Sequence, residues 1–98
     1  MTGYLISKKA LADLRNIWNY TVDAWSEGQA DVYFKHLIQA FEYIACNPTS
    51  SGHSYEDVKK GILGYHMGKH VIFYRILKSG TIRIVRVLHE RMDYKRHF

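Results

Sequence analysis

The sequence has little of several features that mark specialised classes of protein. A single cysteine, Cys46, excludes an internal disulfide and is typical of a protein in a reducing cytosol. The longest apolar runs, such as Val71 to Tyr74, are far shorter than the roughly 20 residues that a membrane-spanning helix needs. The first ten residues contain no apolar stretch typical of a secretory signal. We therefore expect a single cytoplasmic domain over residues 1–98 that has no membrane partner.

Metal and cofactor motifs are also scarce. His66 and His70 are separated by a turn sequence, and no third ligand follows at the spacing of a zinc site. Cys46 has no neighbouring cysteine, and no glycine-rich segment has the form of a phosphate-binding loop. The sequence predicts neither a metal nor a cofactor.

Positive charge is what the chain has in excess. Fourteen lysines and arginines exceed nine aspartates and glutamates, which gives a formal net charge of +5. Such a surface favours an acidic or polyanionic partner, whether nucleic acid, membrane or an acidic protein segment. Charge alone does not choose among them.

The first half of the chain has the pattern of two helices. After Ser7, a possible N-cap, apolar residues recur at steps of one, three or four, which predicts a helix from Lys8 to about Trp25. Trp18 and Trp25 could mark a ligand pocket, but they lie at this spacing, so we interpret them first as core or hairpin-packing residues. Ser26-Glu27-Gly28-Gln29 has the form of a capping box and begins a second helix, which Asn47-Pro48 ends. The short turn makes the pair an antiparallel helical hairpin.

The second half has the pattern of strands. Residues Pro48 to Lys60 are polar and predict a connecting loop. Three segments rich in Ile, Val, Tyr and Phe follow, with hairpin-turn residues between them: Ile62 to Met67, His70 to Leu77 and Thr81 to His89. Tyr4-Leu5-Ile6 can add an N-terminal strand. The order β-α-α-β-β-β predicts an α+β fold: an N-terminal strand, a helical hairpin and a three-stranded antiparallel meander.

The last two strands are apolar on both faces. Strict alternation places Arg86 and Leu88 on the face of Ile82 and Ile84. Two helices can cover only one face of a small sheet, so the second face is apolar with scattered arginines. A partner, a second copy of the chain or the loop Pro48 to Lys60 could cover it, and the pattern leaves these alternatives open.

Side chains suited to a metal-independent ribonuclease occur in the second half of the chain. Such an enzyme needs a general base, a general acid and cations for the phosphate. The candidate residues are His70, Arg75, Arg86, His89, Arg91 and Tyr94. Their spacing does not require catalysis, and a surface that contacts a partner is the favoured interpretation.

The C-terminal half resembles a known family. Gly64-Tyr65-His66, the strand from His70 to Arg75 and the segment from Ile82 to Asp93 are similar to the ParE toxins of the RelE/ParE superfamily. Tyr4-Leu5-Ile6-Ser7 agrees as well, so the resemblance covers nearly the whole chain. Its most specific part is Leu88-His89-x-Arg91-Met92-Asp93.

The resemblance implies the toxin of a type II toxin-antitoxin, plasmid-stabilising module. Its partner would be a ParD-like antitoxin whose flexible, often acidic C-terminal segment wraps the toxin in a hetero-oligomer. DNA would be contacted only indirectly, through the antitoxin. In the ParE branch the toxin binds DNA gyrase, stabilises broken DNA and halts replication.

The RelE branch of the superfamily instead cleaves messenger RNA on the ribosome. Where RNA-cleaving relatives place a phosphate-binding arginine, this chain has His70 or Val71, and Tyr94 is no secure match for a catalytic tyrosine. These departures favour a non-enzymatic gyrase inhibitor with no catalytic residue. The alternatives are a ribosome-dependent messenger RNA endonuclease that uses His70, Arg75, His89 and Arg91, and an inactive relative kept as a binding partner.

We expect the binding site for target and antitoxin at the C-terminal segment from His89 to Phe98 and the arginines beside it. The expected residues are Arg75, Arg83, Arg86, His89, Arg91, Met92, Asp93, Tyr94 and Arg96. The alternative is a solvated end that only packs on the sheet edge. Deletion of Tyr94 to Phe98 is expected to weaken toxicity more than stability. Arg86→Ala is expected to weaken antitoxin binding or toxicity while the fold survives, whereas a buried structural Arg86 would make this variant unfold or fail to express.

Overall fold

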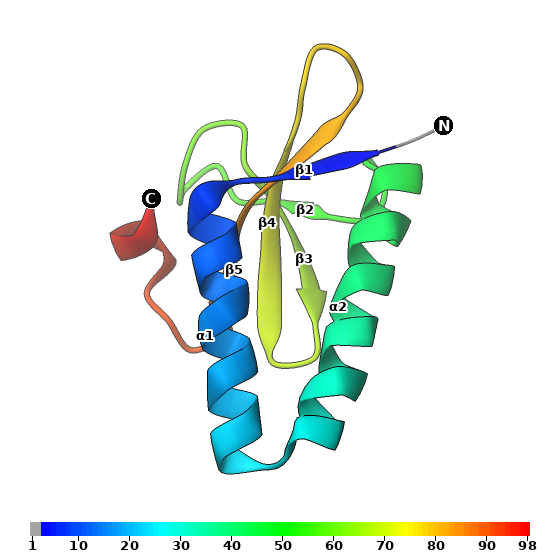
Figure 1. The fold of residues 1–98 in the computed structure, drawn as a ribbon. Coiled ribbons are helices and arrows are strands. Elements are labelled where there is room, and N and C mark those ends of the chain that lie inside the picture. Colours follow the sequence, from blue (N-terminus) through cyan, green and yellow to red (C-terminus); the bar gives the residue numbers. More distant parts are fainter. Residues whose placement is uncertain (1–2) are drawn as a thin grey trace.

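The computed structural model describes residues 3–98, so the first two residues of the predicted domain lie outside the described part. Two helices and a five-stranded mixed sheet form an α+β fold, as predicted (Figure 1). The elements are β1 (Tyr4–Ile6), α1 (Lys8–Ala24), α2 (Glu27–Cys46), β2 (His53–Ser54), β3 (Leu63–Met67), β4 (His70–Ile76), β5 (Ile82–His89) and the 3₁₀ helix η1 (Tyr94–His97).

The helical hairpin begins and ends as the sequence predicts. Ser7 Oγ accepts a hydrogen bond from the Ala10 N–H at 3.0 Å, and Ser26 Oγ accepts one from the Gln29 N–H at 3.1 Å. Both caps lie within four residues of the groups that they satisfy, so local sequence sets these ends. Of the two interpretations of Trp25, the core residue is wrong: Trp25 is the C-cap of α1 and its exposed fraction is 73%.

The sheet has the strand order β1-β5-β4-β3-β2. Strands β3, β4 and β5 form the predicted antiparallel meander, and β1 adds to its edge in parallel with β5. The segment from Pro48 to Lys60 is not entirely a loop, because β2 within it pairs with β3. Only two residues pair there and they show no apolar alternation, so the sequence carries no signal for this strand.

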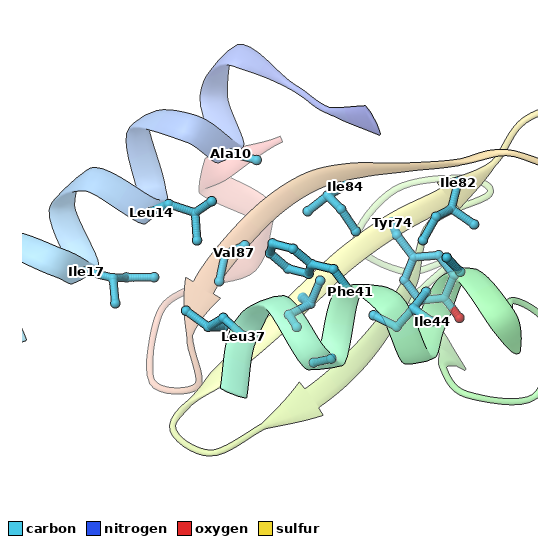
Figure 2. Packing of buried hydrophobic residues seen from close by; sticks show 13 residues of the cluster. Ala10, Leu14, Ile17, Leu37, Phe41, Ile44, Tyr74, Ile82, Ile84 and Val87 are labelled. Carbon is cyan, nitrogen blue, oxygen red and sulfur yellow. The ribbon is translucent and has the colours of Figure 1, made fainter. Parts of the chain in front are cut away.

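The main core lies between the helical hairpin and one face of the sheet. Figure 2 shows Leu14 of α1, Leu37 and Phe41 of α2, and Ile84 and Val87 of β5 pointing toward one another. The buried side chains of this core are each at least nine-tenths buried. Among residues 3–98, no helix is both long and apolar enough to cross a membrane.

The second face of the sheet carries a smaller core of its own. Buried residues of this face pack against side chains from two other segments, namely Tyr55 and Val58 of the loop and Tyr94 and Phe98 of the C-terminus. Phe73 of β4 is the centre, with ring centroids 5.0 Å from Tyr94 and 5.2 Å from Phe98. Of the alternatives for this face, the structure has the loop Pro48 to Lys60 covering it, and the C-terminus covers another part of it.

A β-bulge changes which residues of β5 face the helices. The register pairs Phe73 with Arg86 but Tyr74 with Ile84, so one residue of β5 is extra. Beyond it the alternation shifts, and Val87 enters the main core while Leu88 enters the second. The assignment of Leu88 to the face of Ile84 is therefore wrong, because a single inserted residue reverses every side chain that follows.

Candidate functional site

A groove of about 860 Å³ lies at the end of the molecule where the two helices meet and where β3 turns into β4. Helix α1 forms one wall, the start of α2 and the turn before β4 form another, and the end of β5 closes it. Four of the sequence-based candidates line this groove: His70, His89, Arg91 and Met92.

His70 is fixed at the groove by Tyr33 of α2. The Tyr33 hydroxyl lies 2.6 Å from His70 Nδ1 and also accepts a hydrogen bond from the Lys69 N–H at 3.3 Å. Gly68 permits this approach, because its φ is 59° and a Cβ there would lie 3.0 Å from the hydroxyl. Helix and turn are thus joined through one phenol.

The charge on His70 is suppressed. Burial, together with the neighbouring charge of His89, lowers the pKa of His70 from 6.5 to about 4. The ring is therefore neutral at neutral pH. The Tyr33 hydroxyl that contacts its Nδ1 also donates to the Met67 carbonyl at 3.4 Å. The two imidazoles are cross-strand partners in β4 and β5, with ring centroids 5.4 Å apart.

His70 is poorly suited to act as a general base at neutral pH. An effective general base has a pKa near the working pH, and that of His70 lies well below it. His89 Nδ1 accepts a hydrogen bond from the Arg91 N–H at 3.1 Å, so one nitrogen of each ring has a structural role. Arg75, the fourth residue of the ribonuclease set, is not brought to the groove: its Nη1 donates to the Lys60 carbonyl at 2.9 Å.

Large exposed side chains lie along the groove. Tyr20 and Trp25 of α1 have exposed fractions of 69% and 73%, and that of Met92 is 45%. Arg91, also exposed, lies beside Met92. Trp, Tyr, Met and Arg are the side chains enriched at protein–protein interfaces. Sequence analysis missed Tyr20 because it lies off the apolar stripe of α1, where it reads as an ordinary surface residue.

Arg86 has a structural role beside the groove. Its Nε and Nη2 donate to the two carboxylate oxygens of Asp13 at 2.8 and 2.7 Å, and Nη1 donates to the His97 carbonyl at 2.7 Å. The Arg86 and Asp13 side chains are only 14% and 10% exposed. One guanidinium therefore ties α1 to β5 and to the C-terminus.

Asp13 also completes the edge of β5. Strand β1 pairs with β5 only as far as Ile84, and beyond it the Val87 N–H donates to Asp13 Oδ2 at 3.0 Å. Asp13 is buried although it carries a charged side chain. Its position three residues after Ala10 was the available signal, since that spacing puts both on one side of a helix.

The remaining C-terminal candidates lie outside the groove lining. The Tyr94 hydroxyl donates to the Glu90 carbonyl at 3.0 Å, and its ring packs on Phe73. Asp93 and Arg96 form an exposed ion pair at 3.6 Å. The C-terminus therefore packs on the second face of the sheet rather than only on its edge.

Arg83 and Arg75 lie near the other end of the ladder that β4 and β5 form, where they are cross-strand partners. The predicted binding set is thus divided between two ends of the sheet. Among residues 3–98, no three His, Cys, Asp or Glu side chains gather as metal ligands would.

Comparisons with known proteins agree with this fold. The model of the family described as "ParE toxin of type II toxin-antitoxin system, parDE" matches residues 4–94. The chain is 40% identical to the toxin ParE1 of Mycobacterium tuberculosis over 96% of this chain and 95% of that protein. It is 36% identical to the toxin ParE1 of Caulobacter vibrioides, over 99% of this chain and 98% of that one.

Solved structures are also similar. A chain of the chromosomal ParDE system of P. aeruginosa superposes with a TM-score of 0.74, at 18% identity, over 91% of this chain and 96% of that chain. A chain of the RelBE2 toxin-antitoxin complex of Mycobacterium tuberculosis gives a TM-score of 0.62, at 20% identity, over 91% and 98%. At these identities the likeness concerns the fold, whereas the family model and the curated relatives carry the assignment. The chain belongs to the ParE family, the toxins of type II toxin-antitoxin systems.

Proposed function

We propose that this toxin acts by binding DNA gyrase in the cytoplasm and that a ParD-like antitoxin neutralises it. The single observation that carries the proposal is the membership of the ParE family over residues 4–94. The groove supports it, because its exposed Tyr20, Trp25 and Met92 are suited to a protein partner.

The groove also suits a flexible, acidic antitoxin segment. Its lining is largely apolar, and Lys69 and Arg91 add positive charge. Asp13, the acid in the lining, is already neutralised by Arg86. A disordered segment gains order by burying apolar side chains and pairing its charges, and this lining offers both. Antitoxin bound there would exclude gyrase from the same residues.

A second candidate function is messenger RNA cleavage on the ribosome. The observation that favours it is the convergence of His70, His89 and Arg91 at one groove. Against it stand the low pKa of His70 and the distance of Arg75 from the groove, since phosphate cleavage needs a poised base and several cations. We therefore rank binding above catalysis.

Two assays on one antitoxin-free sample test the proposal. Gyrase supercoiling is followed with a readout for cleaved DNA, and messenger RNA is followed during translation. The proposal predicts that supercoiling stops while the RNA stays intact. Cleaved RNA with unaffected gyrase would instead favour the second candidate, and no effect in either assay would indicate an inactive relative.

A further inference from the structure

The second face of the sheet has an uncovered part. Its apolar residues lie under the loop and the C-terminus, but β4 and β5 continue beyond them toward the turn at 77–81. In Figure 1 this hairpin rises past the rest of the sheet as the orange loop. Arg75 and Arg83 are the charged side chains of its two strands, and Lys78 lies in the turn.

These two arginines lie directly opposite each other. The register pairs Arg75 with Arg83, so both side chains leave the same face of the sheet. Like charges at such a position destabilise a sheet. Within the described residues 3–98, neither guanidinium has a carboxylate within 4.0 Å. The positive charge of this pair is therefore not neutralised by an ion pair within the part of the chain that the structure describes.

Arg75 is held in place by the turn that follows the loop. Its Nη1 donates to the Lys60 carbonyl at 2.9 Å, and a Cβ at Gly61, whose φ is 77°, would lie 2.9 Å from the same nitrogen. Only glycine leaves room for this contact. The contact brings Arg75 to the backbone of Lys60, and the side chains of Lys59 and Lys60 in the same turn are exposed.

The acids of this turn do not cancel the patch. Glu56 is engaged, since one carboxylate oxygen accepts a hydrogen bond from the Gly61 N–H at 2.6 Å. Asp57 is exposed in the same turn. Against these two stand the cations that we call the hairpin-end patch: Lys59, Lys60, Arg75, Lys78 and Arg83.

We propose that the hairpin-end patch binds the phosphate backbone of duplex DNA without reading its sequence. Guanidinium groups bind phosphate oxygens through paired N–H donors, and one arginine here is already oriented. The groove lies at the other end of the ladder, so the patch offers charge rather than a pocket, which is typical of backbone contact. An acidic peptide would need several apolar anchors. The exposed apolar side chains near the patch are Leu5, which pairs with Arg83, and Ile76, which follows Arg75, and two are few for that purpose.

This inference goes beyond the proposed function and departs from the expectation that only the antitoxin touches DNA. A toxin held on a partner by its groove would leave the patch, at the opposite end of the ladder, open to DNA. The binding itself needs no gyrase, so it can be measured on the toxin alone. Failure of gyrase inhibition and failure of DNA binding are then separate results.

The test is fluorescence anisotropy of a labelled duplex of about 20 base pairs, titrated with the full chain at about 50 to 200 mM salt. We expect Arg83→Gln to weaken binding about fivefold or more at the low-salt end and to reduce the salt slope by about 1. Arg96→Gln removes the same charge from the exposed C-terminus and is the matched control, with less than about a twofold change. Lys60→Gln is the second variant, because the Arg75 contact uses only the backbone of Lys60.

Three results would overturn the proposal. The duplex fails to bind even at the lowest salt, or Arg83→Gln and Lys60→Gln lose no more affinity than Arg96→Gln, so that only net charge matters. Alternatively, a poly-glutamate peptide displaces the duplex at a lower charge concentration than unlabelled DNA does, which would identify an acidic polypeptide as the ligand. Thermal melts of each variant confirm that the fold is retained.

Discussion

The ladder formed by β4 and β5 has two identical side chains directly opposite each other near each of its ends. At the groove the pair is His70 and His89, and at the hairpin it is Arg75 and Arg83. The histidine pair is part of the folded structure: Tyr33 contacts His70, and burial keeps His70 neutral. The arginines remain charged and one of them is exposed. The intrinsic pKa of the side chain and its burial together separate the pairs, because a buried histidine becomes neutral whereas arginine keeps its charge.

Arg86 lies between these two pairs and behaves like neither. It is charged, yet the Asp13 carboxylate and the His97 carbonyl use all three of its nitrogens. Arg83, on the same strand, has none of these contacts. Composition alone cannot separate the two arginines, whereas substitution can.

The largest effect is expected from Arg86→Met. It leaves the Asp13 carboxylate buried without its cation, which costs about 3–5 kcal/mol of the free energy of unfolding. We measure it by urea denaturation and use Arg83→Met as the control, which should change stability by less than about 0.5 kcal/mol. Similar small losses for both would show that Arg86 is as free as Arg83. The structure thus replaces the expectation that the fold survives Arg86→Ala.

Deletion of Tyr94 to Phe98 is expected to cost about 2–4 kcal/mol, because two aromatic rings leave Phe73 exposed. The sequence-based expectation rested on a terminus with few core contacts, and this one has several. Thermal melts compare the deletion with Arg96→Ala, an exposed change in the same segment. If the deletion melts within about a degree of Arg96→Ala, the C-terminus does not cover the second face.

Acid should lower the free energy of unfolding through His70 at the groove end, whereas the arginines at the hairpin end keep their charge. The folded pKa of His70 is about 4, below the unfolded value of 6.5, so its contribution to stability is complete above 6.5 and is lost as the pH falls toward 4. After allowance for solvent at a partly exposed ring, the loss is on the order of 1–2 kcal/mol. Urea denaturation at several pH values checks it, with His70→Gln as the control that lacks this component. Parallel curves for the two proteins would contradict a neutral, buried His70.

The smallest effect is expected from Arg83→Gln, measured as stability rather than binding. Removal of one of two facing like charges should raise the free energy of unfolding by up to about 0.5 kcal/mol at low salt. The gain should vanish at high salt, where exposed charges are screened. A loss of stability would show that Arg83 has a structural partner after all.

Local signals made much of the fold predictable from the sequence. Ser7 and Ser26 cap their helices within three residues, and Asn47-Pro48 ends α2 where expected. The meander follows from apolar runs and turn residues. These features depend on neighbours in the chain, which a sequence displays directly.

What escaped prediction depends on residues far apart in the chain. Asp13 meets Arg86 across 73 positions, and the bulge in β5 arises from pairing with β4. The cover of the second face needs Tyr55 and Phe98 to converge on Phe73. The groove likewise joins α1, α2 and β5, so its histidines were foreseen as residue types but its aromatic wall was not.

The most direct test of the account is gyrase inhibition by a matched pair of tyrosine variants. Tyr20 and Tyr43 are both exposed on helices, at 69% and 50%, but only Tyr20 lines the groove. The account predicts that the wild-type toxin stops supercoiling, that Tyr20→Ala needs about tenfold more protein for the same effect, and that Tyr43→Ala matches the wild type. Equal potency of all three proteins would place the gyrase contact outside the groove, and intact supercoiling with the wild type would contradict gyrase as the target.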